Sequence, residues 1–571
     1  MKEFTFRAVL LGVVLGAVFA IGNAYLGLKV GLTVSASIPA AVISMAVLRA
    51  ISRTVTILEN NIVQTIASAG ESLAAGVIFT IPALVYLGEP LELGRVFLIA
   101  LLGGLLGVLL MVPLRHTLMV EEHGTLPFPE GTACAEILRA REGTAERALL
   151  AVWGLVLGVV DKVLIGVFRF WNELARWAIG GTQVALDTTP AMLGVGYIIG
   201  VRYALILFAG GAVAWWVLTP VILAVGGEPD IRSIGIGAVA AAGVISLIRL
   251  FPVLIRSLSG HFKGLISDVF HKHGKERTEQ DLPLLWVLLG VVALLAVLYL
   301  IPQLGMNWLS ILLILVLGFF FVALTSVTVG IVGNSSNPVS GMVICTLLVT
   351  TLIFVALGWT ERIYLILAMT VGSVVAVAVA MAGDTSQDLK TGYLVKATPR
   401  LQQVGALIGT LVPAFVVGWI LIILNDTYGF GSKALPAPQA TMMAAVVEGV
   451  IGGQLPYRLV AIGIVLGVAV ELMGIRSLPF ALGLYLPLGT SVAIGAGGLL
   501  SWLVKDPQGR GVLLGSGLIA GDALTGIVIA GLAIFGLIDL DKGARFGPWI
   551  SLAAYLILAA VFAVLVLKRK R

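Results

Sequence analysis

Apolar stretches long enough to form membrane-spanning helices follow one another along nearly the whole chain. The 571 residues are 59% hydrophobic and only 12% charged, whereas a soluble domain carries roughly 25% charged residues. Segments such as 95–114, 148–168, 282–301, 308–329 and 550–567 approach or reach the roughly 20 residues needed to cross a bilayer. No polar stretch is long enough for a separate soluble domain. The sequence therefore predicts an all-α polytopic membrane protein surrounded by the lipid bilayer.

Three short polar motifs occur twice, in the same order and about 310 residues apart. The first copies are Val18–Tyr25, Ala67–Ser72 and Leu126–Thr132, and the second copies are Val329–Ser336, Ala380–Thr385 and Leu435–Thr441. A duplicated membrane domain with polar groups in corresponding broken helices is typical of secondary transporters. We predict a first transmembrane repeat over 1–257, a basic cytoplasmic loop and linking helix over 258–305, a second repeat over 306–536, and a C-terminal helix with a basic tail over 537–571.

Basic residues predict the orientation of the chain in the membrane. Lys2, Arg7, the turn at Arg49 and Arg53, the loop Lys263–Arg277 and the tail Lys568–Arg571 all read as cytoplasmic. Both termini are then cytoplasmic, and a single joining span turns the second repeat upside down relative to the first. The net charge of +6 follows from this bias and does not indicate nucleic-acid binding. Cys134 and Cys345 match no disulfide or metal-site pattern.

Four segments are too short or too interrupted to be plain spans. Gly124–Ala140 and Ala434–Pro456 each contain a Pro-x-Pro sequence near their start and are predicted to enter the membrane as half-helices and return. Asn23–Lys29 and Asn334–Gly341 interrupt apolar runs with Gly, Asn and Pro. Irregular backbone at membrane depth is tolerated where it is buried in protein or lines a polar cavity, so these breaks predict the transport pathway.

Acidic residues inside apolar segments are the predicted proton-coupling groups. Glu71 lies in an otherwise small and apolar span, and Asp384 and Asp388 lie in the corresponding segment of the second repeat. Ionisable residues at membrane depth are costly and usually serve function, and burial brings a carboxyl group closer to titrating near neutral pH. The alternative is a structural role, in which these acids join helices by hydrogen bonds or pair with Lys390.

The other predicted site residues would contact substrate. Lys29 and Lys390 are candidate counter-charges for a substrate carboxylate, although Lys29 at a helix end could instead extend to the interface. The amide and phenol groups of this set offer neutral hydrogen bonds, or instead satisfy backbone freed by the helix breaks. Glu130, which Gln439 replaces in the second repeat, suggests a specialised cation or amine contact. The full predicted substrate set is Asn23, Tyr25, Lys29, Glu130, Asn334, Asn337, Gln387, Lys390 and Tyr393.

Sequence signatures of enzymes are missing, so no catalytic residues are predicted. No H-E-x-x-H zinc motif and no phosphate-binding G-x-x-x-x-G-K-[ST] loop occurs. We expect no cofactor: protons are the predicted coupling ion, and metal enters only as part of a chelate substrate. His261, His271 and His273 lie in the predicted cytoplasmic loop, where a solvated polar loop is favoured over a metal site.

Taken together, the motifs resemble the oligopeptide transporter superfamily, specifically its prokaryotic branch, which is similar to the yellow stripe-like metal-chelate carriers of plants. The resemblance covers essentially the whole chain and rests on Gly22–Thr33, Asn60–Ser72, Glu122–Thr132, Gly333–Gly341 and Gly383–Arg400. It implies about 16 spans, proton-coupled uptake across a prokaryotic plasma membrane, and substrates that are small peptides or peptide-like metal chelates. Substrate size, coupling stoichiometry and a homo-oligomeric state are not fixed by these motifs.

The resulting hypothesis is a secondary active transporter that carries protons with small oligopeptides or metal chelates by alternating access. A passive channel for small solutes is the first alternative, and it predicts uptake that never exceeds equilibrium. An intramembrane hydrolase is a remote second alternative, because no nucleophile with a basic partner is visible in the sequence.

Overall fold

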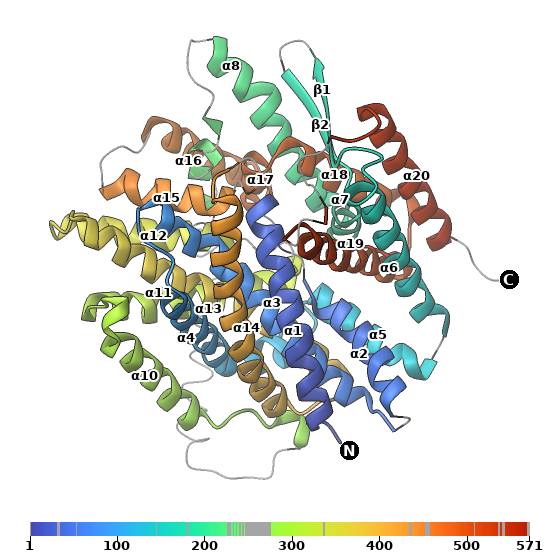
Figure 1. The fold of residues 1–571 in the computed structure, drawn as a ribbon, viewed down its shortest axis with the longest axis horizontal. Coiled ribbons are helices and arrows are strands. Elements are labelled where there is room, and N and C mark those ends of the chain that lie inside the picture. Colours follow the sequence, from blue (N-terminus) through green and yellow to red (C-terminus); the bar gives the residue numbers. More distant parts are fainter. Residues whose placement is uncertain are drawn as a thin grey trace. The chain divides into compact units, whose positions relative to one another are not determined.

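The computed structural model describes a nearly all-helical chain (Figure 1). The described residues are 2–30, 33, 35–52, 54–143, 145–179, 182–224, 230, 231, 233–235, 237, 238, 241, 242, 245, 276–334, 337, 339–432, 435, 437–451, 457–506, 509–534, 537, 538 and 543–567. Within them, ten helices are long and apolar enough to cross a membrane. The prediction of a polytopic helical membrane protein is therefore confirmed. The predicted histidines of the cytoplasmic loop and the basic tail 568–571 lie outside the described residues.

The chain divides into two compact units, and the first combines 1–139 with 247–455. Its helices come from both predicted repeats. They are α1 (Phe6–Val30), α2 (Ser37–Ile51), α3 (Ile57–Tyr86), α4 (Leu93–Met111), α5 (Pro129–Gly143, which runs past the unit boundary), α10 (Leu284–Leu300), α11 (Trp308–Val332), α12 (Val339–Ala356), α13 (Arg362–Val395), α14 (Pro399–Tyr428) and α15 (Pro438–Ile451). All predicted site residues belong to this unit. The predicted repeat boundaries themselves stay a prediction.

The centre of this first unit is a pair of long buried helices, α3 and α13, which run in opposite directions. The start of α13 lies at the end of α3, because Arg362 donates hydrogen bonds of 3.0 Å to the carbonyls of Leu87 and Gly88. The two backbones nearly touch: a Cβ added to Gly76 would lie 2.4 Å from Cα of Val377. Small residues allow such close approach between membrane helices.

Two hydrogen bonds connect the halves of the chain reciprocally. The backbone N–H of Phe128, in the first Pro-x-Pro sequence, donates to the carbonyl of Gly330 at 2.8 Å, two residues before α11 ends. The N–H of Ala437, in the second Pro-x-Pro sequence, donates to the carbonyl of Leu28 at 2.8 Å, two residues before α1 ends. Phe128 and Ala437 both have positive φ, at 45° and 41°, a region that residues other than glycine rarely occupy. The same strained turn is thus built twice.

The predicted helix breaks are correct in the second half and displaced in the first. α11 ends at Val332 and α12 begins at Val339, so the break at 333–338 lies where it was expected. In the first half the expectation was wrong: Asn23–Lys29 is helical and belongs to α1, and the break falls between Val30 and α2. Glycines are frequent in membrane helices, and Gly22 and Gly27 do not end this one. α5 and α15 each begin at the second proline of Pro-x-Pro.

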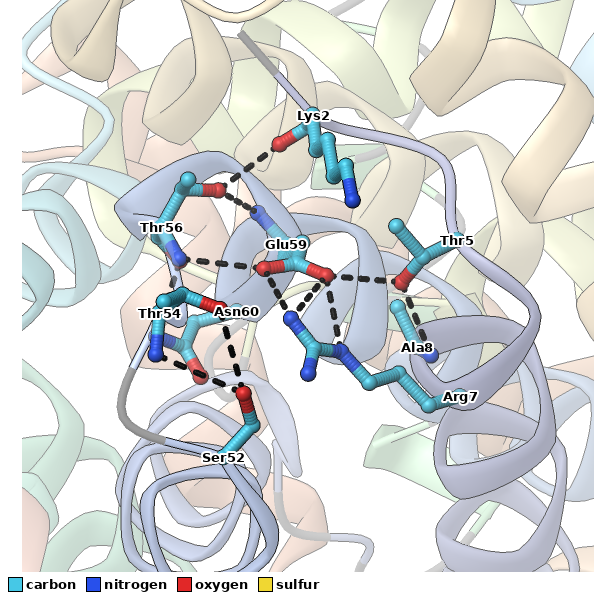
Figure 2. Close-up of polar contacts among 9 residues, drawn as sticks. All are labelled: Lys2, Thr5, Arg7, Ala8, Ser52, Thr54, Thr56, Glu59 and Asn60. Carbon is cyan, nitrogen blue, oxygen red and sulfur yellow. Dashed lines mark hydrogen bonds and ion pairs between the residues drawn. The ribbon is translucent and has the colours of Figure 1, made fainter.

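Hydrogen bonds and an ion pair connect the N-terminal residues to the beginning of α3 (Figure 2). Thr56 and Glu59 form a capping box, in which each side chain accepts a hydrogen bond from the other's backbone N–H. The buried Glu59 carboxylate also accepts from Arg7, at 2.8–2.9 Å, and from the Thr5 hydroxyl at 2.9 Å. The negative charge of the buried Glu59 carboxylate is therefore paired with the Arg7 guanidinium, as a buried ion requires.

The second compact unit combines 140–246 with 456–571. It contains α6 (Ala145–Gly166), the antiparallel hairpin β1 (Leu174–Ile179) and β2 (Thr182–Asp187), α7 (Pro190–Ala212), α8 (Thr219–Ala224), α16 (Tyr457–Leu472), α17 (Ser477–Tyr485), α18 (Leu488–Val504), α19 (Arg510–Ile534) and α20 (Pro548–Leu567). α7 and α18 pack through small residues, because added Cβ atoms on Gly196 and Gly497 would each meet the opposite backbone within 2.0–2.3 Å. The hairpin was not predicted from the sequence.

Candidate functional site

Asp388 is bound by hydroxyl and amide groups from α2 and α3. Its Oδ1 accepts from Ser37 at 3.2 Å and from the Gln64 amide, and its Oδ2 accepts from Ser68 at 2.6 Å. Gln64 and Ser68 are four residues apart on α3, so they occupy one face of that helix. Asp388 is 1% exposed and has no basic partner among the described ion pairs. The alternative in which it pairs with Lys390 is wrong for the described contacts.

Glu71 lies on the same helix as Gln64 and Ser68, and it faces a helix start. Its Oε2 accepts a hydrogen bond of 3.1 Å from the backbone N–H of Ala36, the residue just before α2. The carboxylate is close enough to Asp384, Asp388 and Glu130 to interact with all three electrostatically. The structure therefore brings the three predicted proton-coupling residues and one predicted substrate residue into one cluster of buried acids, which we call the acid cluster: Glu71, Glu130, Asp384 and Asp388.

Asp384 connects the acid cluster to the broken segment between α11 and α12. Its Oδ1 accepts from the Asn334 amide at 3.2 Å. Asn337 donates to the Thr325 hydroxyl at 2.6 Å, and its backbone N–H donates to the Asn334 carbonyl at 3.0 Å. The two asparagines thus connect the irregular segment to Asp384 and to α11, and their contact with substrate stays a prediction.

Several buried polar atoms in the first half of α3 have no hydrogen-bond partner among the described residues. They are Gln64 Oε1, Asn60 Oδ1 and both amide atoms of Asn61. Leaving such an atom unsatisfied in a dry interior costs about 1–3 kcal/mol each. Burying these atoms is therefore costly unless other polar groups reach them.

Gln387 joins α13 to both neighbouring irregular segments. Its amide nitrogen donates to the Val329 carbonyl at 2.7 Å, and its oxygen accepts from the Gly131 N–H at 2.8 Å. This contact holds the start of α5 against α13 and places Glu130 beside Gly333, where an added Cβ would lie 3.0 Å from Glu130 Oε1. Gln387 is therefore a positioning residue for Glu130.

Lys390 lies on α13 near the end of that helix, within a group of aromatic side chains. Its Nζ is 2.8 Å from His123 Nδ1 and 3.3 Å from the Leu126 carbonyl. The ammonium also lies 5.3 Å from the ring centre of Phe128 and 5.8 Å from that of Tyr393, within cation–π range. Partial desolvation of the ring and the neighbouring Lys390 charge lower the pKa of His123. His123 and Tyr393 contact each other edge to face.

The remaining predicted residues are placed on α1. Asn23 and Tyr25 are buried, at 5% and 4% exposed. Lys29 belongs to the last turn of α1, and its side chain lies outside the described residues. The assignment of these three residues to substrate stays a prediction.

Sequence reasoning missed four residues that complete the site. Gln64 and Ser68 have a signal in the sequence: with Asn60, Glu71 and Ser72 they form a polar stripe with helical spacing. Ser37 and His123 have none, because they reach the site from a helix start and from the loop before α5.

Two acids of the second unit have structural partners. Glu471 accepts from the N–H and hydroxyl of Ser477, at 2.8 and 2.5 Å, and so caps α17. Asp522 lies 3.5 Å from the Lys162 ammonium, which also binds Glu173 at 3.1 Å. No group of three or more metal-binding side chains with suitable geometry occurs in the part of the chain that the structure describes.

Comparison with known proteins agrees with these features. The family model described as "OPT oligopeptide transporter protein" matches residues 3–533. A Haemophilus influenzae protein named as a candidate oligopeptide transporter is 31% identical across 90% of this chain and 95% of its own length. A candidate oligopeptide transporter of Saccharomyces cerevisiae is 28% identical across 34% of this chain and 29% of its own length. A candidate metal-nicotianamine transporter of Arabidopsis thaliana is 24% identical across 76% of this chain and 70% of its own length.

The matched relatives are transporters and not enzymes, which confirms that prediction. The family match spans both compact units and includes the whole acid cluster. The chain belongs to the OPT oligopeptide transporter family of integral membrane transporters.

Proposed function

We propose that this protein is a secondary active transporter that couples inward proton movement to the uptake of small peptides or peptide-like metal chelates. The single observation that carries the proposal is the acid cluster, in which Glu71, Asp384 and Asp388 are buried together without a basic partner among the described residues. Like charges at close range in a buried site are relieved when one of them binds a proton. A site of this kind takes up and releases protons when its exposure changes.

The arrangement of the helices supports alternating access between two inverted repeats. α3 and α13, which carry the corresponding acids, run in opposite directions. The reciprocal bonds from Phe128 to Gly330 and from Ala437 to Leu28 have the form expected of a twofold relation. With the ten candidate spans and the shorter apolar helices, we propose about 16 membrane crossings or partial crossings in a prokaryotic plasma membrane, with both chain ends in the cytoplasm.

The substrate class follows from the chemistry around the cluster and from the relatives. Carboxylates, amides and a buried ammonium are grouped within one stretch of α13, and they match the amine, amide and carboxylate groups of peptides and of amino-acid chelators. Relatives are named for transport of oligopeptides and of metal–nicotianamine complexes. Metal is proposed as substrate cargo, and no resident cofactor is proposed.

Uptake by purified protein in proteoliposomes tests the coupling. An inward gradient of one pH unit supplies about 1.4 kcal/mol per proton, which corresponds to a tenfold accumulation. We expect the wild type to concentrate trialanine, or the iron chelate of nicotianamine, when such a gradient is imposed. Glu71→Gln should exchange substrate across the membrane but lose the gradient-driven accumulation.

Glu361→Gln is the matched control, because Glu361 is an exposed acid immediately before α13. It should accumulate substrate like the wild type. Wild-type uptake that ignores the gradient, or full accumulation by Glu71→Gln, would contradict the coupling. Uptake that never exceeds equilibrium in any condition would favour a passive channel instead.

A further inference from the structure

Lys390 carries a buried charge that the described residues do not neutralise. The residue is 1% exposed, and no carboxylate lies within 4.0 Å of its ammonium among the described ion pairs. Two of its three N–H donors have acceptors, namely His123 Nδ1 and the Leu126 carbonyl. The aromatic faces of Phe128 and Tyr393 offset part of the cost of burial. One N–H of the Lys390 ammonium and most of its positive charge are therefore available to bind an anion.

His123 is prepared to donate to the same anion. An ammonium can only donate, so Nδ1 of His123 must accept the Lys390 bond and the ring proton must be on Nε2. His123 lies in the loop before α5 and is exposed, so a ligand can reach its Nε2–H. Lys390 and His123 together present two N–H donors and one positive charge, which is the pattern that binds a carboxylate through charge-assisted hydrogen bonds.

The opposite charge lies further along the same helix. Asp384 is six residues before Lys390, and the helical rise separates the two by about 9 Å along the axis. Asp384 is 1% exposed and interacts electrostatically with Glu130. Two to three residues of extended peptide span about 7–10 Å, so a short zwitterion has the length to reach from one pole to the other.

We infer that the Lys390–His123 pair binds the terminal carboxylate of the substrate while Asp384 and Glu130 receive its amino group. This inference rests on the proposed function and makes it more specific: the substrates are zwitterions of two or three residues, or chelates with the same span, that need a free carboxylate. Gln387 is the positioning residue between the poles, because it fixes the start of α5 that carries Glu130.

Binding of trialanine and of trialanine amide to the purified protein tests the carboxylate pole. The wild type should bind the acid at least tenfold more tightly than the amide. Lys390→Gln should reduce this ratio to about one by weakening only the acid, whereas Lys390→Arg should keep a clear preference for the acid. His123→Gln should reduce the ratio a few-fold, since it removes one donor and leaves the charge.

Lys396→Gln is the control, because Lys396 is an exposed lysine that caps the end of α13. Its ratio of acid to amide affinity should equal that of the wild type. Retained amide binding shows that Lys390→Gln is folded; if that variant does not bind the amide, the ratios of Lys390→Arg and His123→Gln decide. The amino pole is tested in the same way, by comparing the binding of trialanine and N-acetyl-trialanine to the wild type and to Asp384→Asn.

The result separates this inference from the proposed function. If trialanine is not bound, the iron(II) chelate of nicotianamine and its methyl ester replace the peptide pair. Two results would overturn the carboxylate assignment alone, provided that either substrate is transported. One is an unchanged preference for the acid in Lys390→Gln, and the other is no such preference in the wild type. Failure to transport both substrates would overturn the proposed function.

Discussion

The contact between Lys390 and His123 fixes the protonation state of the histidine ring. The 2.8 Å bond from Lys390 requires a neutral His123 ring with its proton on Nε2. Partial desolvation of the ring and the Lys390 charge both disfavour a second proton, and they lower the pKa of His123. Protonation would also break the bond, so the contact is present at neutral pH and weakens as pH falls below the ordinary histidine pKa of about 6.5.

We therefore predict that the pKa of His123 rises when Lys390 is replaced. Reaction of histidine with diethyl pyrocarbonate, followed by mass spectrometry of the peptide that contains His123, reports the fraction of neutral ring as a function of pH. The midpoint should lie below 6.5 in the wild type and move up toward that value in Lys390→Gln. An equal midpoint in Lys396→Gln and the wild type is the control, and an unchanged midpoint in Lys390→Gln would contradict the contact.

At the site, residue types were predictable and partners were not. Glu71, Asp384 and Asp388 were predicted because ionisable residues inside apolar segments are rare and costly, and the structure places them together. The alternative in which an acid pairs with Lys390 does not hold among the described contacts, because Lys390 contacts the loop before α5. Which face of α13 meets which loop depends on tertiary packing, and a repeat motif does not encode it.

At the scale of elements, close helix contact depends on single glycines. The crossing of α3 and α13 leaves no room for a side chain at Gly76, where a Cβ would lie 2.4 Å from Cα of Val377. The backbone there cannot yield as a flexible side chain would. Gly94, in the first turn of α4, has no atom within 4 Å of its added Cβ, so it offers a matched comparison in the same unit.

We predict opposite effects for alanine at these two glycines. Gly76→Ala should lower the melting temperature of the purified protein, because overpacking a tight contact costs about 1–3 kcal/mol. Gly94→Ala should leave it unchanged or raise it slightly, because alanine favours helix by up to about 1 kcal/mol over glycine. Thermal unfolding followed by intrinsic fluorescence measures both, and equal effects of the two substitutions would contradict the crossing.

Helices were more predictable than their ends. Apolar runs identified α4, α6, α10, α11 and α20 to within a few residues, because hydrophobic length is a direct constraint of the bilayer. The break predicted at Asn23–Lys29 was wrong, since glycine and asparagine permit a helix to end without forcing it. The hairpin β1–β2 escaped prediction because its strands are short and lie beside membrane-length apolar segments.

At the scale of the whole molecule, polar contacts gather particular loops of the first unit at one end. Arg277 bonds the hydroxyl of Thr398 at 3.0 Å and the carbonyl of Lys396 at 2.8 Å, and it pairs with Glu3. The chain start, the segment before α10 and the turn between α13 and α14 therefore lie together. Arg362, the first residue of α13, lies at the other end of that helix. Positive charge predicts that the group of loops around Arg277 is cytoplasmic.

Cysteine labelling tests this sidedness. In a background where Cys134 and Cys345 are replaced by serine, Glu361→Cys should react with a membrane-impermeant maleimide in intact cells. Lys396→Cys should react only after the cells are permeabilised, because the proposed orientation places this end of α13 in the cytoplasm. Both residues are exposed, so access and not burial decides the result. The reverse pattern would invert the proposed orientation.

The reciprocal bonds between the Pro-x-Pro turns and the helix ends have a consequence for biosynthesis. Phe128 finds its acceptor on Gly330, about 200 residues later in the chain, and at roughly 5–20 residues per second the ribosome needs about 10–40 s to make them. Ala437 returns the bond to Leu28, among the earliest residues translated. Neither half can complete its own turn, so both turns can form only after the chain has been made as far as Ala437, about three quarters of its 571 residues.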